Sequence, residues 1–422
     1  MSILKSISHR FPKEGDANTM VQLERMIDVL SKDNEFVEEV LRSFSISQEQ
    51  YKDVVPIPNL KFLIDDLELN DSKIEKIDVP VLIRNVYAEK FLKNEAAIFN
   101  LVGLKSPEFI KTLGKDSLEV ETCYSAKTDF FELFHMGNFV NYWGTRGKDD
   151  LIQDVLEKLR NEREDKISAR LVRLKDDGKY FLRAITSESG YKKYGINFSL
   201  MIAVLSLWDY MKRTNEQVYI SNYQVDESKI SVSFSIARNK KISDKQDISF
   251  NLILKNDEIK ESSVSMNACF RLIYREDHRE TYLDLLPSSY SKSLHEYKTD
   301  MLSYTHAMKV TTVCEKVSHI SEFIDEYVKQ VSVIAPKIID KKNPAEIKEY
   351  VIKRISLART DYFTKYKEPV VNKLISIDVN TVFDLFEALR SVEELFGDDI
   401  QSRMFWQSKM YDIIVNGGQD QI

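Results

Sequence analysis

The sequence is poor in glycine, proline and cysteine, and each shortage excludes a class of structure. Only 12 of the 422 residues are glycine and 9 are proline, so long irregular linkers are not expected. No G-x-x-x-x-G-K-S/T or G-x-G-x-x-G motif occurs, so we expect no nucleotide cofactor. The three cysteines, Cys123, Cys269 and Cys314, form no C-x-x-C pair, which argues against a disulfide framework and a thiolate zinc site.

Long hydrophobic runs are also missing. No run approaches 18 apolar residues, and the N-terminal stretch MSILKSISHRFPKEGD is too polar for a signal peptide. We therefore expect no membrane span and a cytoplasmic protein, in keeping with the separated cysteines. The formal net charge of -7 gives the whole chain no attraction to nucleic acid or membrane, so any such attraction has to be local.

The residues that are present indicate a folded α+β protein. Hydrophobic residues make up 43% of the chain and aromatic residues 11%, which is ample for a sizeable core in two or three domains. We predict a mostly helical region with short strands at 1–150, an antiparallel β-rich core at 151–283 and a helical domain at 284–422. Within the first region, 87–100 is expected to be helical and 117–126 a strand.

The central region has the clearest strand pattern. KISARLVRL and KYFLRAI flank Asp176-Asp177-Gly178, a strong hairpin signal. A helix is expected at about 197–213, followed by four strands. In SVSFSI, Val232, Phe234 and Ile236 alternate with three serines, which predicts a sheet with one buried face.

The C-terminal region follows helical spacing, with further helices expected at 344–359, 360–375 and 379–396. Apolar residues three and four apart form a narrow seam at 310–331. Its partner is either another helix of the same chain or a second copy of the protein, which would make the chain a homo-oligomer. The seam begins with Val310, Val313, Val317, Ile320 and Ile324.

Basic and aromatic residues are interleaved between positions 179 and 245. This stretch contains 11 Lys and Arg residues but only 6 Asp and Glu residues. Cationic side chains pair with phosphates, and aromatic rings can stack on unpaired bases. A solvated sheet edge with core tyrosines would explain the same residues. The candidate nucleic-acid-binding residues are Arg183, Tyr191, Lys192, Lys193, Tyr194, Arg238, Lys240 and Lys241.

One pattern hints at catalysis. Asp247 is followed eleven residues later by Glu258-Ile259-Lys260, and metal-dependent nucleases use an acid together with an E-x-K sequence to hold Mg²⁺. Here the E-x-K lies in NDEIKESS, which is typical of a charged turn, so we assign no catalytic or metal-binding residue. Whether Asp247, Glu258 and Lys260 bind a metal stays open.

Two passages carry a resemblance. YFLRAITSESGYKKYGIN, with Arg183, Ala184, Ser187, Tyr194 and Asn197, resembles the R-A-x-x-S-x-x-Y-x-x-x-D-N passage of a phage and plasmid protein family of unknown function. ILKNDEIKESSVSMNACFRL resembles a second passage of that family through Asn256, Glu258, Ser263, Arg271 and Leu272, although Lys260 stands in place of its glycine and its cysteine is missing.

The resemblance covers about residues 170–280 and implies no activity. By fold-level analogy, a strand-rich core with a basic, aromatic-bearing loop is similar to phage single-strand annealing proteins. We therefore expect non-catalytic binding or annealing of single-stranded nucleic acid, in the DNA metabolism of a phage or mobile element. The alternatives are an assembly protein that uses the 310–331 seam and a metal-dependent nuclease.

Overall fold

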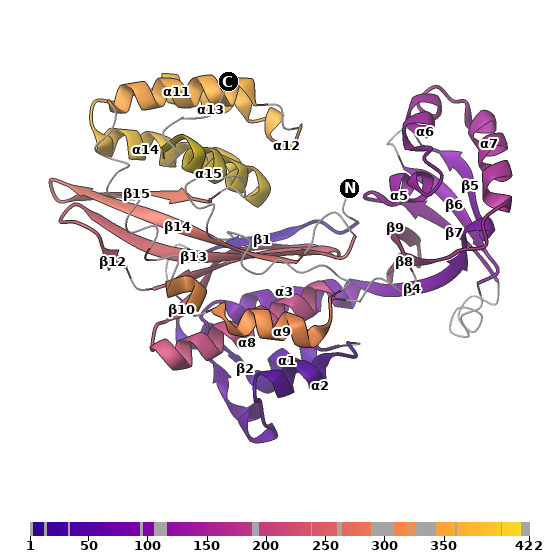
Figure 1. Cartoon of the computed structure of the whole chain (residues 1–422), viewed down its shortest axis with the longest axis horizontal. Coiled ribbons are helices and arrows are strands. Elements are labelled where there is room, and N and C mark those ends of the chain that lie inside the picture. Colours follow the sequence, from indigo (N-terminus) through magenta and orange to yellow (C-terminus); the bar gives the residue numbers. More distant parts are fainter. Residues whose placement is uncertain are drawn as a thin grey trace.

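Two β-sheets, each with its own hydrophobic core, organise the protein (Figure 1). The computed structural model describes residues 3–414 except 12–14, 33, 93–95, 105–115, 188–193, 238, 260–263, 288–307, 321, 326–328, 330–342, 359–360 and 398. The α+β class is confirmed, and helices occupy the C-terminal part as expected.

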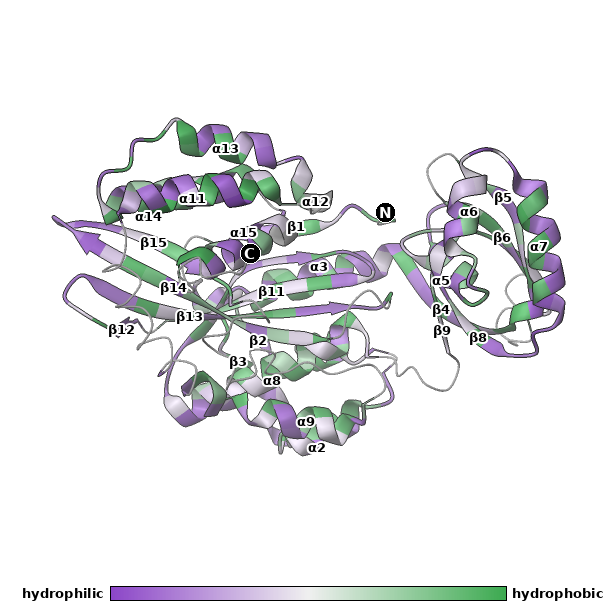
Figure 2. Ribbon diagram, turned by 45° about the horizontal axis from the view of Figure 1, so that its top comes forward, coloured by the Kyte–Doolittle hydropathy of each residue, from purple (hydrophilic) through white to green (hydrophobic). Residues whose placement is uncertain are grey.

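The seven-stranded sheet is antiparallel and has the order β1-β10-β11-β13-β14-β15, with β12 paired to β13. Alternate side chains along each strand point to opposite faces, so Val232 and Phe234 enter the core while Ser233 and Ser235 line the other face. Figure 2 shows this alternation as changes between green and purple along the strands. The strands are β1 (Ile7–Arg10), β10 (Val218–Val225), β11 (Lys229–Ile236), β12 (Lys240–Lys241), β13 (Gln246–Asp257), β14 (Ser265–Glu276) and β15 (Arg279–Leu285).

Helices cover this sheet in two groups (Figure 1). Helix α8, which is buried along most of its length, contacts β13, and α3 contacts β10. The first group is α1 (Leu23–Leu30), α2 (Val37–Ser43), α3 (Leu60–Lys73), α8 (Ile196–Thr214) and α9 (Val310–Ser318). The second group, of which α14 and α15 contact β15, is α11 (Pro344–Leu357), α12 (Asp361–Thr364), α13 (Lys367–Ile375), α14 (Val382–Glu393) and α15 (Ile400–Ile414).

The six-stranded sheet has the order β4-β8-β9-β7-β6-β5 and forms a separate lobe, which α3 and β4 join to the rest (Figure 1). Only its β7–β9 pair is parallel. Helices α5 (Ala126–Glu132), α6 (Gly137–Gly144) and α7 (Asp149–Asn161) contribute to its core. The strands are β4 (Ile74–Leu82), β5 (Val86–Phe91), β6 (Ala97–Val102), β7 (Ser117–Thr122), β8 (Lys166–Leu174) and β9 (Tyr180–Ser187). The short β2 (Val21–Gln22) and β3 (Val54–Val55) pair separately, and single 3₁₀ turns include η3 (Ile83–Asn85) and η5 (Glu394–Phe396).

Two expectations differ from the structure. The helix expected at 87–100 is wrong, because β5 and β6 occupy this stretch and bury alternate residues, as half-buried strands do. The hairpin around Gly178 forms, and Gly178 has the positive φ of +68° that such a turn requires. However, its strands pair with β4 and β7 rather than with β10 or β11, so the boundary expected at 150/151 runs through the six-stranded sheet.

The seam at 310–331 packs inside the chain. Helix α9 contacts α2 and α8, and Val310, Val313, Val317, Ile320 and Ile324 all belong to the core of the seven-stranded sheet. The remaining seam positions, Tyr327 and Val331, lie outside the described residues. A surface that is buried in its own protomer is not available to a second copy, so the structure does not support assembly through these residues.

This packing predicts a stability effect. Ile320 is fully buried, so Ile320→Ala should lower the free energy of unfolding by about 2–5 kcal/mol through lost burial and a new cavity. The exposed Lys316 of α9 is a nearby control, because Lys316→Ala should change stability by less than about 0.5 kcal/mol. Urea denaturation followed by circular dichroism measures both. Equal, small effects of the two substitutions would contradict the packing.

Candidate functional site

Glu258, at the end of β13, is buried where the two sheets meet. Its carboxylate accepts hydrogen bonds from Arg183 of β9, from Lys76 of β4, at 3.2 Å from Nζ to Oε1, and from the backbone N–H of Ile196 at the start of α8, at 2.9 Å. Its backbone carbonyl accepts a bond of 2.7 Å from Nη1 of Arg170 in β8. One residue therefore binds three strands of the six-stranded sheet and the first turn of α8.

The charges around Glu258 decide its ionisation. Burial alone would raise the pKa of its carboxyl, but Lys76, Arg183 and Arg170 outweigh burial and hold the pKa well below its usual range. The carboxylate is therefore ionised at neutral pH and pairs with cations that are themselves largely buried. A buried charge that loses its partner is costly, so we interpret this cluster, the Glu258 junction, as structural.

Strand β9 and the end of β13 meet at this junction through Arg183 and Glu258. Beside them, the side-chain amide of Asn256 donates hydrogen bonds to the carbonyl oxygens of Tyr194 and Gly195 and to the hydroxyl of Ser199. These residues thus hold the end of β13 against the start of α8.

Several residues expected on a basic surface lie elsewhere. Arg183 is only 1% exposed and is bound to Glu258, so its expected place on a surface is wrong. The same holds for Tyr194, which is 1% exposed, stacks on Phe198 and donates its hydroxyl proton to the carbonyl of Met308. Both residues are buried because Glu258 binds Arg183 of β9 and the backbone of Ile196, which places β9 and the start of α8 in the interior.

Only part of the expected basic cluster can be located. Lys240 and Lys241 are exposed on β12, where Lys241 pairs with Asp244 at 2.8 Å. The residues that lie outside the described part of the chain are Tyr191, Lys192, Lys193 and Arg238. The described residues therefore do not form the single basic surface that the sequence suggested.

The nuclease pattern does not assemble either. Asp247 and Glu258 lie at opposite ends of β13, and eleven residues of strand span about 36 Å. Asp247 pairs with Arg275 at 2.7 Å, and Lys260 lies outside the described residues. The two carboxylates are too far apart to hold one ion. In the part of the chain that the structure describes, no group of three or more His, Cys, Asp or Glu residues is arranged to hold a metal.

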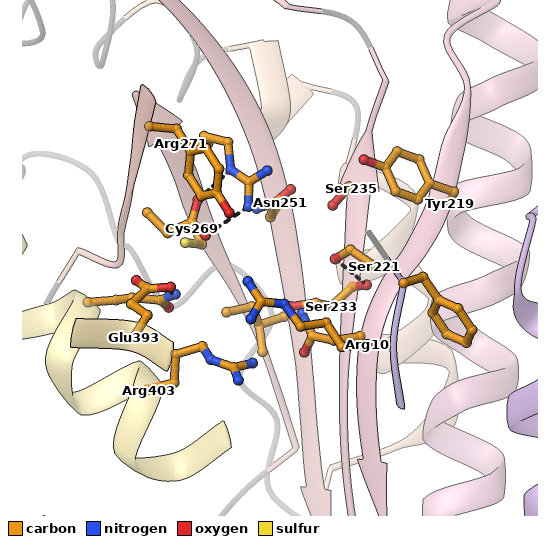
Figure 3. Close-up of a pocket in the computed structure, with 16 residues that line it drawn as sticks. Arg10, Tyr219, Ser221, Ser233, Ser235, Asn251, Cys269, Arg271, Glu393 and Arg403 are labelled. Atoms are coloured by element: carbon orange, nitrogen blue, oxygen red, sulfur yellow. Dashed lines mark hydrogen bonds and ion pairs between the residues drawn. The ribbon is translucent and has the colours of Figure 1, made fainter. Parts of the chain in front are cut away.

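A polar pocket lies on the other face of the seven-stranded sheet, between its strands and α15 (Figure 3). Two neighbouring rows of paired residues build its floor. One row crosses from Tyr219 to Ser235, Asn251 and Cys269, and the next from Arg10 to Asn222, Ser233 and Ile253. Residues from five adjacent strands thus converge on one surface.

A β-bulge shapes this floor. The pairing of β10 with β11 slips between Ile220 and Asn222, so that Ser221 and Asn222 both line the pocket while Ile220 and Tyr223 both reach the core. Bulges insert one extra residue into a strand and often re-aim side chains at functional sites. Without the extra residue, Asn222 would point into the hydrophobic core.

Charged side chains line one end of the pocket. Arg271 donates two hydrogen bonds to Asp284, at 2.7 and 2.9 Å, and its guanidinium lies over the ring of Tyr282. Arg403 of α15 donates to the carbonyl of Gly397. Glu393 is buried beside them, and both burial and the carboxylate of Asp284 raise the pKa of its carboxyl to about 8. Glu393 is therefore mostly neutral at pH 7.

Arg10 differs from the other arginines of the pocket because it is exposed and makes no side-chain hydrogen bond or ion pair with any described residue. Figure 3 shows its guanidinium reaching from β1 across the floor toward α15. With Glu393 neutral, the charged groups of the pocket are three guanidinium groups and one carboxylate. The pocket therefore favours an anion.

The chemistry that the pocket offers is binding rather than covalent catalysis. Its one thiol, Cys269, is buried, and burial raises its pKa well above the usual value, so it carries no thiolate at neutral pH. The hydroxyl, amide, carboxyl and guanidinium groups of the pocket can hydrogen-bond a polar ligand.

Sequence reasoning missed the pocket although part of its signal was visible. The serines that alternate with apolar residues in β11 predicted a sheet with only one buried face. Two of the three are in fact buried, with Ser233 8% and Ser235 6% exposed. Small uncharged polar residues repeated on neighbouring strands, such as Asn251 opposite Ser235, could have marked a buried polar face. The contributions of Arg10 and Arg403 depend on long-range packing and leave no local signal.

Comparisons with protein-family models, with curated proteins and with solved structures give no match to this chain. Among the described residues, no helix combines the length and the apolar character that a membrane crossing needs.

The Glu258 junction predicts a pH-dependent stability effect. Glu258→Gln should lower the free energy of unfolding at pH 7 by about 3–5 kcal/mol, because it leaves Arg183 buried without its counter-charge. The folded-state pKa of Glu258 lies below its unfolded value, so the stabilisation is present above about pH 4.5 and is lost as the pH falls below it. The difference in free energy of unfolding between the wild type and Glu258→Gln should therefore become smaller as the pH falls.

The matched control is Glu75→Gln. Glu75 lies next to Lys76 on β4 and pairs with Arg173 at 3.4 Å, but its side chain is 44% exposed. Its loss should cost at most about 1 kcal/mol. Chemical denaturation of the two variants between pH 3 and pH 8 tests the assignment. If the difference in free energy of unfolding between the two variants does not change with pH, Glu258 does not stabilise the fold through its charge.

Proposed function

We propose that this chain binds single-stranded nucleic acid without catalysis, and that the polar face of the seven-stranded sheet is the contact surface. The observation that carries the proposal is the pocket on that face, where Arg10, which pairs with no described residue, stands over buried serine and asparagine side chains. A single strand offers phosphates to the arginines and base edges to the hydroxyl and amide groups.

One aromatic residue of the pocket fits the same ligand. Tyr219, on β10 at one side of the pocket, is partly exposed, whereas the ring of Tyr282 is already covered by the guanidinium groups of Arg271 and Arg390. Rings on a sheet surface can stack on unpaired bases, each worth about 1–3 kcal/mol. Double-stranded DNA keeps its bases stacked, so this chemistry favours a single strand.

The proposal moves the site away from the residues that the sequence suggested. Arg183 and Tyr194 are left out because they are buried. Lys240 and Lys241 are exposed, but they lie on β12, whereas the pocket is lined by β1, β10, β11, β13, β14, β15, α14 and α15. They remain an alternative contact surface that mutation can separate from the pocket.

The proposal predicts two different responses to mutation. Arg10→Ala should weaken binding of an oligothymidylate several-fold and make the slope of log affinity against log salt shallower by about 0.7, the loss of one phosphate contact on a single strand. Tyr219→Ala should weaken binding and leave the slope unchanged, because stacking releases no counterions. Fluorescence anisotropy of a labelled oligonucleotide at several salt concentrations measures both.

Two controls locate the surface. Arg84→Ala removes an exposed arginine near the six-stranded sheet and should have no effect. Lys240→Ala combined with Lys241→Ala tests the β12 alternative. If only this double variant loses affinity, the pocket is not the contact surface. No anisotropy change with wild-type protein at the lowest salt concentration would refute nucleic-acid binding altogether.

A further inference from the structure

The size of the polar pocket limits what can enter it. Its volume is about 90 Å³, whereas pockets that enclose whole small molecules measure roughly 300–1,000 Å³. It can hold several water molecules or one compact polar group, but it cannot enclose a nucleoside. Any larger ligand must place one small group in the pocket and the rest over the sheet.

The pocket also contains polar side chains that have no hydrogen-bond partner among the described residues. Asn251 and Ser235 are 9% and 6% exposed as residues, and neither side chain makes a hydrogen bond with a described residue. Figure 3 shows both side chains within the pocket. Their amide and hydroxyl groups can therefore donate hydrogen bonds to a ligand that enters the pocket.

We propose that the pocket is a binding site for a single phosphate group, held by the guanidinium groups of Arg10 and Arg403 and by the side chains of Asn251 and Ser235. A phosphate group is compact and multiply charged, and it accepts several hydrogen bonds at once. This deepens the proposed function and rests on it only for the source of the phosphate, which is either a nucleic-acid strand or the free ion.

Glu393 makes the proposed site depend on pH. Its carboxyl lies in the same pocket, and its pKa is raised to about 8 by burial and by Asp284. The neutral carboxyl can donate a hydrogen bond to a phosphate oxygen, whereas the carboxylate repels the anion. Phosphate should therefore bind when Glu393 is protonated and be expelled as the pH rises through this pKa.

Other groups around Glu393 do not produce this pH dependence. The arginines keep their charge throughout the range, and a phosphate group only gains negative charge as the pH rises, which favours binding to arginines and cannot cause a loss of affinity. Burial keeps the thiol of Cys269 protonated. The charged and titratable groups that line the pocket with Glu393 are Arg10 of β1, Tyr219 of β10, Cys269 and Arg271 of β14, Tyr282 and Asp284 of β15 and Arg403 of α15.

Isothermal titration calorimetry with three probes tests the proposal. The probes are inorganic phosphate, an oligothymidylate with a 5′-phosphate and the same strand without it. We assume that only protein with a protonated Glu393 binds phosphate. With a pKa of about 8, the fraction of protein in this form falls from about 0.9 at pH 7 to about 0.03 at pH 9.5, so the affinity for phosphate should weaken roughly 30-fold. Glu393→Gln, which cannot ionise, should abolish this loss.

Glu387→Gln is the matched control, because Glu387 lies on the same helix but pairs with Arg390 outside the pocket. Its pH profile should follow that of the wild type. Thermal unfolding of each variant at both pH values checks that the fold is retained. Tighter binding of the 5′-phosphorylated strand identifies a terminal phosphate as the occupant, and binding of inorganic phosphate that excludes both strands identifies the free ion.

Two results would overturn the proposal. One is oligonucleotide binding that is unaffected by the 5′-phosphate, by added inorganic phosphate and by Glu393→Gln, which would leave the proposed nucleic-acid function intact without a phosphate site. The other is failure of all three probes to bind at pH 7, which would refute both. Binding of inorganic phosphate with no oligonucleotide binding would support the phosphate site and refute the nucleic-acid function.

Discussion

The ion-pair cluster at Glu258 is the constraint on which the rest of the structure depends. Its carboxylate and carbonyl together bind strands β4, β8 and β9 and the first turn of α8. Helix α8 is in turn the central helix of the larger core. The same strand, β13, runs on from the junction to Asn251 in the pocket. A change in the position of Glu258 would therefore be transmitted along a single rigid strand to the pocket floor.

The larger sheet bears an unusual distribution of polarity. One face is hydrophobic and supplies the core, while the other buries serine, asparagine and charged side chains beneath α14 and α15. Burying polar groups is unfavourable unless they are hydrogen-bonded, so a hydrophobic second face would have made a more stable protein. Natural sequences depart from the most stable arrangement mainly where function requires it. The buried polar groups therefore favour a functional site on this face of the seven-stranded sheet.

Local patterns predicted the elements better than their assembly. The alternation in β11, the Asp-Gly turn before β9 and the 3-4 spacing of α9 each identified an element correctly, because each depends on neighbouring residues. The pairing of β8 with β4 depends instead on contacts about 90 residues away in sequence, such as Arg170 with Asp78. Glu258 was misread for the same reason, since its sequence neighbours resemble a charged turn, while its partners come from distant strands.

The pocket joins segments from nearly opposite ends of the described chain, because Arg10 belongs to β1 and Arg403 to α15. During synthesis, β10 and β11 leave the ribosome before α15, so a chain that ends before Arg403 lacks one of the three guanidinium groups that line the pocket. The complete pocket therefore exists only after α15 has been synthesised and packed against the sheet.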